Sequence, residues 1–185
     1  MSRAFVDEDA SDSSEAEAPE IKIPIPPGSR NYLTPEGAEA LSGELHDLTG
    51  TERPHILAQL ATHGGSADAP APDEIASLRR RLGEMDRRIA YLYAMSSLAE
   101  VQHPPPPEGR ERVKFGAWVR VRDGDGAEAE YRIVGVDEAD PPRGLIGWPS
   151  PVARALMGRQ AGDDAVVRLP AGTRTLTVVG VEYRG

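Results

Sequence analysis

Five arginines lie close together near the middle of the chain, and arginine is the side chain best suited to holding phosphate. They are Arg79, Arg80, Arg81, Arg87 and Arg88. A guanidinium group binds phosphate oxygens through paired hydrogen bonds, so the cluster can contact a nucleic-acid backbone without reading its bases. The structural alternative is that these arginines form the solvent-facing side of a helical rod, or pair with acids on a neighbouring helix. The residues alone leave both interpretations open.

Composition excludes several other kinds of site. The chain has no cysteine, which rules out disulfides, thiolate zinc sites and cysteine nucleophiles. His55 and His63 lack partners at metal-site spacing, so no role is assigned to them. The net charge of −9 disfavours a protein that binds bare nucleic acid, and a protein partner or a basic channel fits better. No apolar run reaches the roughly 20 residues of a membrane span, and no signal peptide is visible, so a cytoplasmic location is expected.

Two apolar patterns with helical spacing must position the arginines. The first begins at Thr34-Pro35-Glu36, where Thr34 can cap a helix and Pro35 suits its first turn. Pro54 should bend this helix, because proline lacks a backbone N–H. Both patterns advance in steps of three or four residues, through Ala38, Leu41, Leu45, Leu48, Ile56, Leu57 and Leu60 and then through Ile75, Leu78, Leu82, Met85, Ile89 and Leu92. The break His63-Gly64-Gly65-Ser66 separates them, so residues 31–102 are predicted to form an antiparallel coiled-coil hairpin with arms about 40 Å long.

The segments flanking the hairpin have different compositions. In residues 1–30 acids alternate with serine and alanine before a proline-rich approach, which predicts a disordered acidic arm that buries no face. Residues 103–112 contain His103-Pro104-Pro105-Pro106-Pro107 and are expected to form a stiff proline-rich linker.

Residues 113–185 change to strand periodicity. Alternating segments at 117–122, 131–136, 165–169 and 176–181 predict an antiparallel sheet, with a hairpin turn at Asp123-Gly124-Asp125-Gly126. Trp118 falls within the first alternating strand and is expected in the core. Ser150 and Pro151 have the residue types of a helix cap and first turn, so one short helix should follow. The predicted class is therefore α+β.

The ordered motifs of residues 32–183 resemble the Gre transcript-cleavage factors, and GreB more than GreA. The matching segments are Tyr32-Leu33-Thr34-Pro35-Glu36-Gly37, Glu52-Arg53-Pro54, Arg81-Leu82-Gly83-Glu84-Met85-Asp86-Arg87-Arg88, Phe115-Gly116-Ala117-Trp118-Val119, Tyr131-Arg132-Ile133-Val134-Gly135, Asp137-Glu138 and Ser150-Pro151-Val152-Ala153-Arg154-Ala155-Leu156. The resemblance implies an FKBP-like C-terminal domain that docks at the mouth of the secondary channel of bacterial RNA polymerase. It also implies a hairpin that enters the channel, where Arg79, Arg80, Arg87 and Arg88 would contact RNA near its 3′ end.

The resemblance further implies that two acids at the hairpin tip hold a second Mg²⁺ in the polymerase active site, in a two-metal hydrolysis of the phosphodiester bond. Asp68 aligns with the first acid, but Ala71 stands where the second acid is expected. One reading is that Asp68 with Asp73 or Glu74 makes a shifted pair that shares Mg²⁺ with the polymerase. The other is that Asp73 and Glu74 only complement the dipole of the second helix. No stably bound cofactor is expected.

The family's polymerase-contacting corner reads Asp-Ser-Pro, and here Pro149 stands where that acid is expected while Ser150 and Pro151 remain. The chain is therefore expected to be a monomer that binds RNA polymerase and inserts its hairpin toward the active site, with stimulated RNA cleavage as the finer expectation. It would be at most a cofactor of the polymerase's own cleavage activity, and not an enzyme alone. The alternative, raised by Ala71, is a non-catalytic regulator that occupies the channel and competes with true Gre factors.

Overall fold

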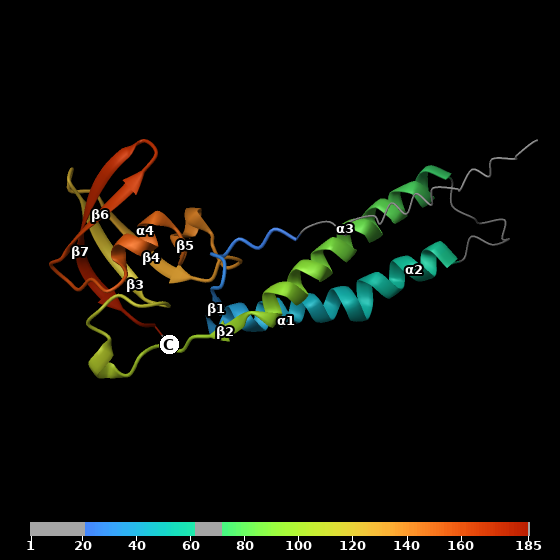
Figure 1. Cartoon of the computed structure of the whole chain (residues 1–185), viewed down its shortest axis with the longest axis horizontal. Coiled ribbons are helices and arrows are strands. Elements are labelled where there is room, and N and C mark those ends of the chain that lie inside the picture. Colours follow the sequence, from blue (N-terminus) through green and yellow to red (C-terminus); the bar gives the residue numbers. More distant parts are fainter. Residues whose placement is uncertain (1–20, 62–71, 185) are drawn as a thin grey trace, which may run out of the picture.

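A rod of two helical arms projects from one end of a curled five-stranded sheet (Figure 1). The computed structural model describes residues 21–61 and 72–184. Residues 1–20, which make up most of the predicted acidic arm, lie outside that part of the chain. The α+β class and the helical hairpin are confirmed. None of the described helices combines the length and apolar composition that a membrane span requires.

The first arm is made of α1 (Pro35–Asp47), a π-helical turn (Leu48–Glu52) and α2 (Arg53–Ala61). Thr34 caps α1 as predicted, because its side-chain oxygen accepts the N–H of Gly37 at 3.0 Å. The bend expected at Pro54 takes the form of the π-helical turn just before it. There the N–H of Arg53 bonds to the carbonyl of Leu48, five residues back, so the helix absorbs one extra residue ahead of the proline.

The second arm is one continuous helix, α3 (Pro72–Ser97). Its predicted seam faces the first arm, with Met85 and Leu92 buried against a stripe that includes the buried Leu41 and Ile56. Leu57 was expected in the same stripe but is 39% exposed. A two-helix rod buries only a narrow seam along each helix, so positions beside that seam stay in solvent.

The base of the rod contains a pair of strands that the sequence did not signal. The strands β1 (Asn31–Leu33) and β2 (Ala99–Val101) pair in parallel beside the ends of the helices. Asn31 is fully buried and donates its side-chain amide to the carbonyl of Met95 at 3.2 Å. Ile25 is also buried here, 9% exposed, against a cluster that includes Leu33. The prediction that residues 1–30 bury nothing is therefore wrong at Ile25.

The C-terminal sheet has the strand order β5-β4-β3-β7-β6. Its strands are β3 (Trp118–Asp123), β4 (Glu128–Val134), β5 (Leu145–Gly147), β6 (Asp164–Leu169) and β7 (Gly172–Glu182). All neighbouring pairs are antiparallel except β4 and β5, which run parallel. The fully antiparallel sheet predicted from the sequence needs this correction at one edge, because the chain loops back over residues 135–144 before β5 begins.

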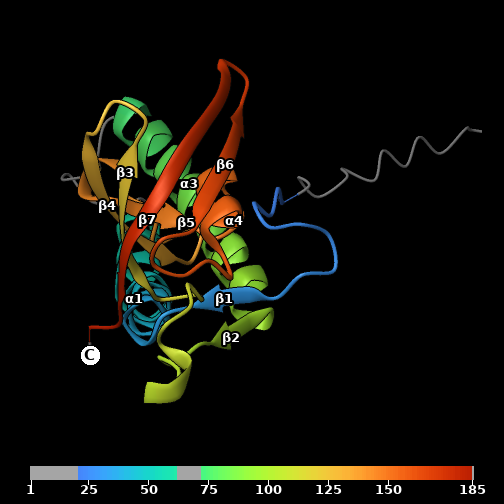
Figure 2. The same ribbon diagram turned by 90° about the vertical axis from the view of Figure 1, so that its left-hand side faces the viewer.

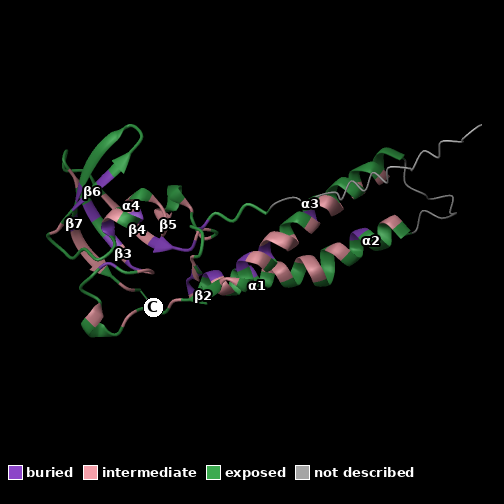
Figure 3. Cartoon of the chain, in the orientation of Figure 1, coloured by how far each residue is buried: buried purple, intermediate pink, exposed green. Residues whose placement is uncertain are grey.

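The helix α4 (Pro151–Leu156) packs against this sheet and closes its core. Ala153 and Leu156 of α4 meet Val119, Ile133 and Val167 of the sheet, all at most 1% exposed. Figure 3 colours the buried stretches of these strands purple. Figure 2 shows α4 lying beside β5 and β6, with the rod emerging behind the sheet. The predicted one-helix arrangement is thus observed.

Trp118 does not belong to this core, contrary to expectation. On β3 the buried positions are Val119 and Val121, so Trp118 projects from the other face, since strand side chains alternate. The guanidinium groups of Arg132 and Arg184 lie over its ring at 5.8 and 4.5 Å from the centroid. The tryptophan is held by cation–π contacts rather than by apolar packing.

Candidate functional site

The far end of the rod carries the acids singled out from the sequence. Asp68 and Ala71 lie outside the described residues. Asp73 and Glu74 are exposed in the first turn of α3, directly after Pro72. Consecutive residues on a helix point about 100° apart, so these two carboxylates do not face one another. Among the described residues, no group of three acidic or histidine side chains is placed to hold a metal ion.

The arginines of α3 divide into two groups. Arg88 makes two hydrogen bonds, of 2.6 and 2.7 Å, to the carboxylate of Glu44 on α1, and it also lies over the ring of Tyr91. This contact lowers the pKa of Glu44 and raises that of Arg88. Arg81 approaches Glu52 at 3.6 Å. Both therefore follow the structural interpretation, in which arginines tie the two arms together.

Arg79, Arg80 and Arg87 are exposed, and none of them forms an ion pair within the described part of the chain. Of the four arginines predicted to contact RNA, these three remain available on the surface of the rod, whereas Arg88 is engaged. A further pair between the arms, Arg53 with Asp86 at 2.7 Å, was not anticipated. Both residues lie in segments that the family resemblance had singled out.

The joint between the rod and the sheet is centred on Glu138. Its Oε1 atom accepts the N–H of Thr34 at 3.0 Å and the N–H of Gly135 at 3.1 Å. Its Oε2 atom accepts the hydroxyl of Thr34. A Cβ atom at Gly37 would overlap the same carboxylate. One side chain of the sheet domain thus binds the cap residue of α1, and the first turn of that helix fits closely over it.

Two further contacts cross the joint at its edges. The hydroxyl of Tyr91 on α3 donates to Asp137 at 2.7 Å, and burial together with that carboxylate raises the tyrosine pKa. Arg132 on β4 lies 3.4 Å from Glu36 at the start of α1. Sequence reasoning did not assign a role to Glu138 or to Asp137. The available signal was the Asp137-Glu138 pair within the family resemblance, but nothing local identified partners on α1 and α3.

The corner Pro149-Ser150-Pro151 begins α4. The oxygen of the Ser150 side chain accepts the N–H of Ala153 at 3.2 Å, which makes Ser150 a helix cap. Arg154 donates to the carbonyl of Pro149 at 2.7 Å, which ties the helix to the corner. Pro151 is exposed. The cap and the Arg154 bond thus fix the backbone of the corner, and Pro151 is the residue that it exposes to solvent.

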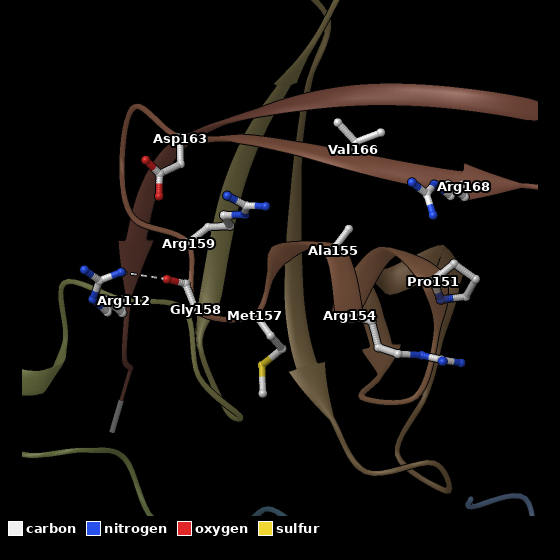
Figure 4. Close-up of a pocket in the computed structure, with 10 residues that line it drawn as sticks. All are labelled: Arg112, Pro151, Arg154, Ala155, Met157, Gly158, Arg159, Asp163, Val166 and Arg168. Carbon is white, nitrogen blue, oxygen red and sulfur yellow. Dashed lines mark hydrogen bonds between the residues drawn. The ribbon is translucent and has the colours of Figure 1, made fainter.

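Beside this corner runs an open groove of about 790 Å³, bounded by α4 on one side and by β6 on the other (Figure 4). Its lining includes the apolar side chains Ala155, Met157 and Val166. Its charged lining residues are Arg112, Arg154, Arg159, Arg168 and Asp163. Four arginines against one acid make the groove locally basic within a chain of net charge −9.

Family comparison adds independent information to this geometry. Residues 31–101 match the family described as "Transcription elongation factor, N-terminal", and residues 107–183 match "Transcription elongation factor, GreA/GreB, C-term". The two matches meet near the boundary between the rod and the sheet domain.

Individual relatives match along most of their length. The transcription elongation factor GreB of Neisseria meningitidis serogroup A is 37% identical over 155 residues, covering 84% of this chain and 95% of the relative. GreA of Verminephrobacter eiseniae is 39% identical over 153 residues, covering 82% and 97%. Among solved structures, GreA factor homolog 1 of Thermus thermophilus matches with 22% identity and a TM-score of 0.37, covering 83% of this chain and 99% of that one.

Proposed function

Because this chain belongs to the GreA/GreB family of transcription elongation factors, we propose that it binds bacterial RNA polymerase at the secondary channel and directs its hairpin toward the active site. The observation that carries the proposal is the joint at Glu138. A probe that reaches a distant site must hold its direction, and the bonds from Glu138 to Thr34 and Gly135 tie the rod to the sheet domain.

The sheet domain and the helical rod would have different roles in binding the polymerase. The half-buried Ser150 and the exposed Pro151 form the corner by which the sheet domain would dock at the rim of the channel. The rod would then lie within the channel, with the exposed Arg79, Arg80 and Arg87 close enough to contact phosphates at the RNA 3′ end. Such contacts hold the RNA backbone without selecting its sequence.

Mg²⁺-dependent cleavage makes a stricter demand on the hairpin tip. The described carboxylates, Asp73 and Glu74, diverge around the first turn of α3 and do not by themselves fit a resident Mg²⁺ site. Ala71 stands where the family pattern expects the second acid. These two observations favour a regulator that occupies the channel without stimulating cleavage. The competing candidate is a cleavage factor in which Asp68 with Asp73 or Glu74 shares Mg²⁺ with the polymerase.

An RNA-cleavage assay separates the two candidates. The substrate is a backtracked elongation complex of the cognate polymerase with Mg²⁺, and the proteins are the native chain, Asp68→Ala and Ala71→Glu. We expect the native chain to bind polymerase without stimulating cleavage, and Ala71→Glu to gain it. Cleavage by the native chain that Asp68→Ala abolishes would establish the cleavage factor instead. Failure of the native chain to bind polymerase would overturn the proposed function itself.

A further inference from the structure

We propose that the basic groove between α4 and β6 binds the chain's own acidic N-terminal segment, residues 1–20, with Phe5-Val6 on its apolar floor and Asp7-Glu8-Asp9 against its arginines. The lining of the groove has four arginines and one acid among apolar and glycine residues: Arg112, Arg154, Arg159, Arg168, Asp163, Pro151, Ala155, Met157, Gly158 and Val166.

The groove arginines are not neutralised by the rest of the described chain. Arg112 donates to the carbonyl of Gly158 at 2.9 Å, and Arg154 donates to the carbonyl of Pro149. None of the four arginines lies within ion-pairing distance of a carboxylate in residues 21–61 or 72–184. A cluster of like charges is unfavourable without counter-charge, so the groove favours an anionic occupant.

The groove also exposes apolar side chains, which an occupant would have to cover. Val166 is 52% exposed and Met157 is 40% exposed, both high values for apolar side chains. A free phosphate group or a bare acidic run would leave this surface uncovered. A peptide that places apolar side chains beside acids covers both features, and an extended peptide suits a groove bounded by an edge strand and a short helix.

Residues 1–20 have the matching composition. They hold seven of the chain's 30 acidic residues and one of its 21 lysines and arginines. Phe5-Val6 is directly followed by Asp7-Glu8-Asp9, so apolar and acidic side chains stand next to one another in this segment.

Residues 1–20 are covalently attached to the folded chain, which favours their binding over that of a free peptide in solution. Ile25 is buried at the base of the rod, and Figures 1 and 2 place residues 21–30 on the α4 side of the sheet. The 14 residues between Val6 and Ile21 span up to about 50 Å when extended. A short tether gives an effective concentration of the order of 1 mM, so even a weak intrinsic affinity suffices to fill the groove.

The exposed arginines of α3 offer the arm a competing basic surface. Arg81 and Arg88 already face carboxylates of the first arm, and the remaining Arg79, Arg80 and Arg87 are exposed on the surface of α3. The groove differs in placing exposed apolar side chains among its arginines. Arginine changes on α3 provide a matched control.

The test uses the chain from residue 21 onward, labelled for NMR and titrated with a synthetic peptide of residues 1–20. This shortened chain keeps every contact described above, and its spectrum is first compared with that of the full chain. We expect saturable shifts at α4 and β6 that weaken at least tenfold between 50 and 500 mM salt. Arg112→Gln with Arg159→Gln and Arg168→Gln should weaken binding at least tenfold. Arg79→Gln with Arg80→Gln and Arg87→Gln should leave it within twofold.

Peptide variants locate the contact within the arm. Changing Asp7, Glu8 and Asp9 to their amides should weaken binding at least tenfold, whereas the same change at Asp12, Glu15 and Glu17 should have a smaller effect. Shifts confined to α3, binding insensitive to the groove variant, or no saturable binding up to 5 mM peptide would each overturn the proposal. Equal effects of the two peptide variants would overturn the assignment to Phe5-Val6 and the acids that follow them.

One consequence rests on the proposed function. Pro151 belongs both to the docking corner and to the groove, so an arm in the groove would cover part of the docking surface. Removing residues 1–20 should then raise polymerase affinity about threefold or more. If neither form binds polymerase, the proposed function fails while the NMR result on the arm and groove still stands.

Discussion

Replacing Glu138 by alanine should loosen the joint between rod and sheet, and the cost can be estimated from its hydrogen bonds. The change leaves the backbone N–H groups of Thr34 and Gly135, and the hydroxyl of Thr34, without their acceptor. A hydrogen bond to a charged group contributes about 1.5–3 kcal/mol. Because Glu138 is half-buried, water can reach part of the vacated space. Taking the lower figure for each backbone N–H gives a cost of about 3 kcal/mol.

Native-state hydrogen exchange at Gly37 measures this cost, because that amide bonds to Thr34 and not to Glu138 itself. A loss of about 3 kcal/mol corresponds to roughly a hundredfold faster exchange through local opening. Glu138→Gln is the matched control. It keeps one oxygen for both N–H groups and should accelerate exchange by about tenfold or less. Gly37 exchange in Glu138→Ala that stays within threefold of the native rate would refute the account of the joint.

Two further changes test packing and charge in the rod. Gly37→Ala should lower the free energy of unfolding in urea by about 1–3 kcal/mol, because the added methyl overlaps the Glu138 side chain. Gly43→Ala is the control: its methyl meets open space, so it should raise the free energy of unfolding by about 0.5–1 kcal/mol. Equal effects of the two changes would contradict the crowding at Gly37. Glu44→Gln should cost at most about 1 kcal/mol at pH 6. Arg88 lowers the Glu44 pKa, so that stability is present above the usual value of 4.5 and is lost as pH falls below it. The gap between the urea midpoints of the native and Gln chains should narrow as the pH falls below 4.5, and a constant gap would exclude this pair as the cause.

Features encoded by neighbouring residues were predictable from the sequence. Thr34 and Ser150 were identified as helix caps, and each accepts the expected backbone N–H. The apolar steps of the second helix placed Met85 and Leu92 in the seam, where both are buried. In each case the signal and its structural partner lie within a few residues, or repeat with the period of one helix.

Features that depend on distant partners were not predictable in this way. Glu138 binds a residue 104 positions earlier, and Ile25 is buried only because the ends of both helices meet beside it. For Trp118 the alternation was read correctly but the buried face was chosen wrongly, since a period of two does not say which face meets the core. The same limit applies to charge. A net value of −9 gave no hint that Arg112, Arg154, Arg159 and Arg168 line one groove.

In the proposed function, one part of the chain sets the direction of the rod and another would determine whether RNA is cleaved. The direction of the rod depends on the joint between Thr34 and Glu138, whose hydrogen bonds are formed in the folded chain. Chemistry depends on the tip, where Ala71 departs from the family pattern and the described acids diverge. A misplacement of order 1 Å can cost about a hundredfold in rate, so a tip that no longer gathers an ion can lose cleavage while the rod still reaches its target. A loss confined to the tip would convert a cleavage factor into an occupant of the same channel without rebuilding the joint or the docking corner.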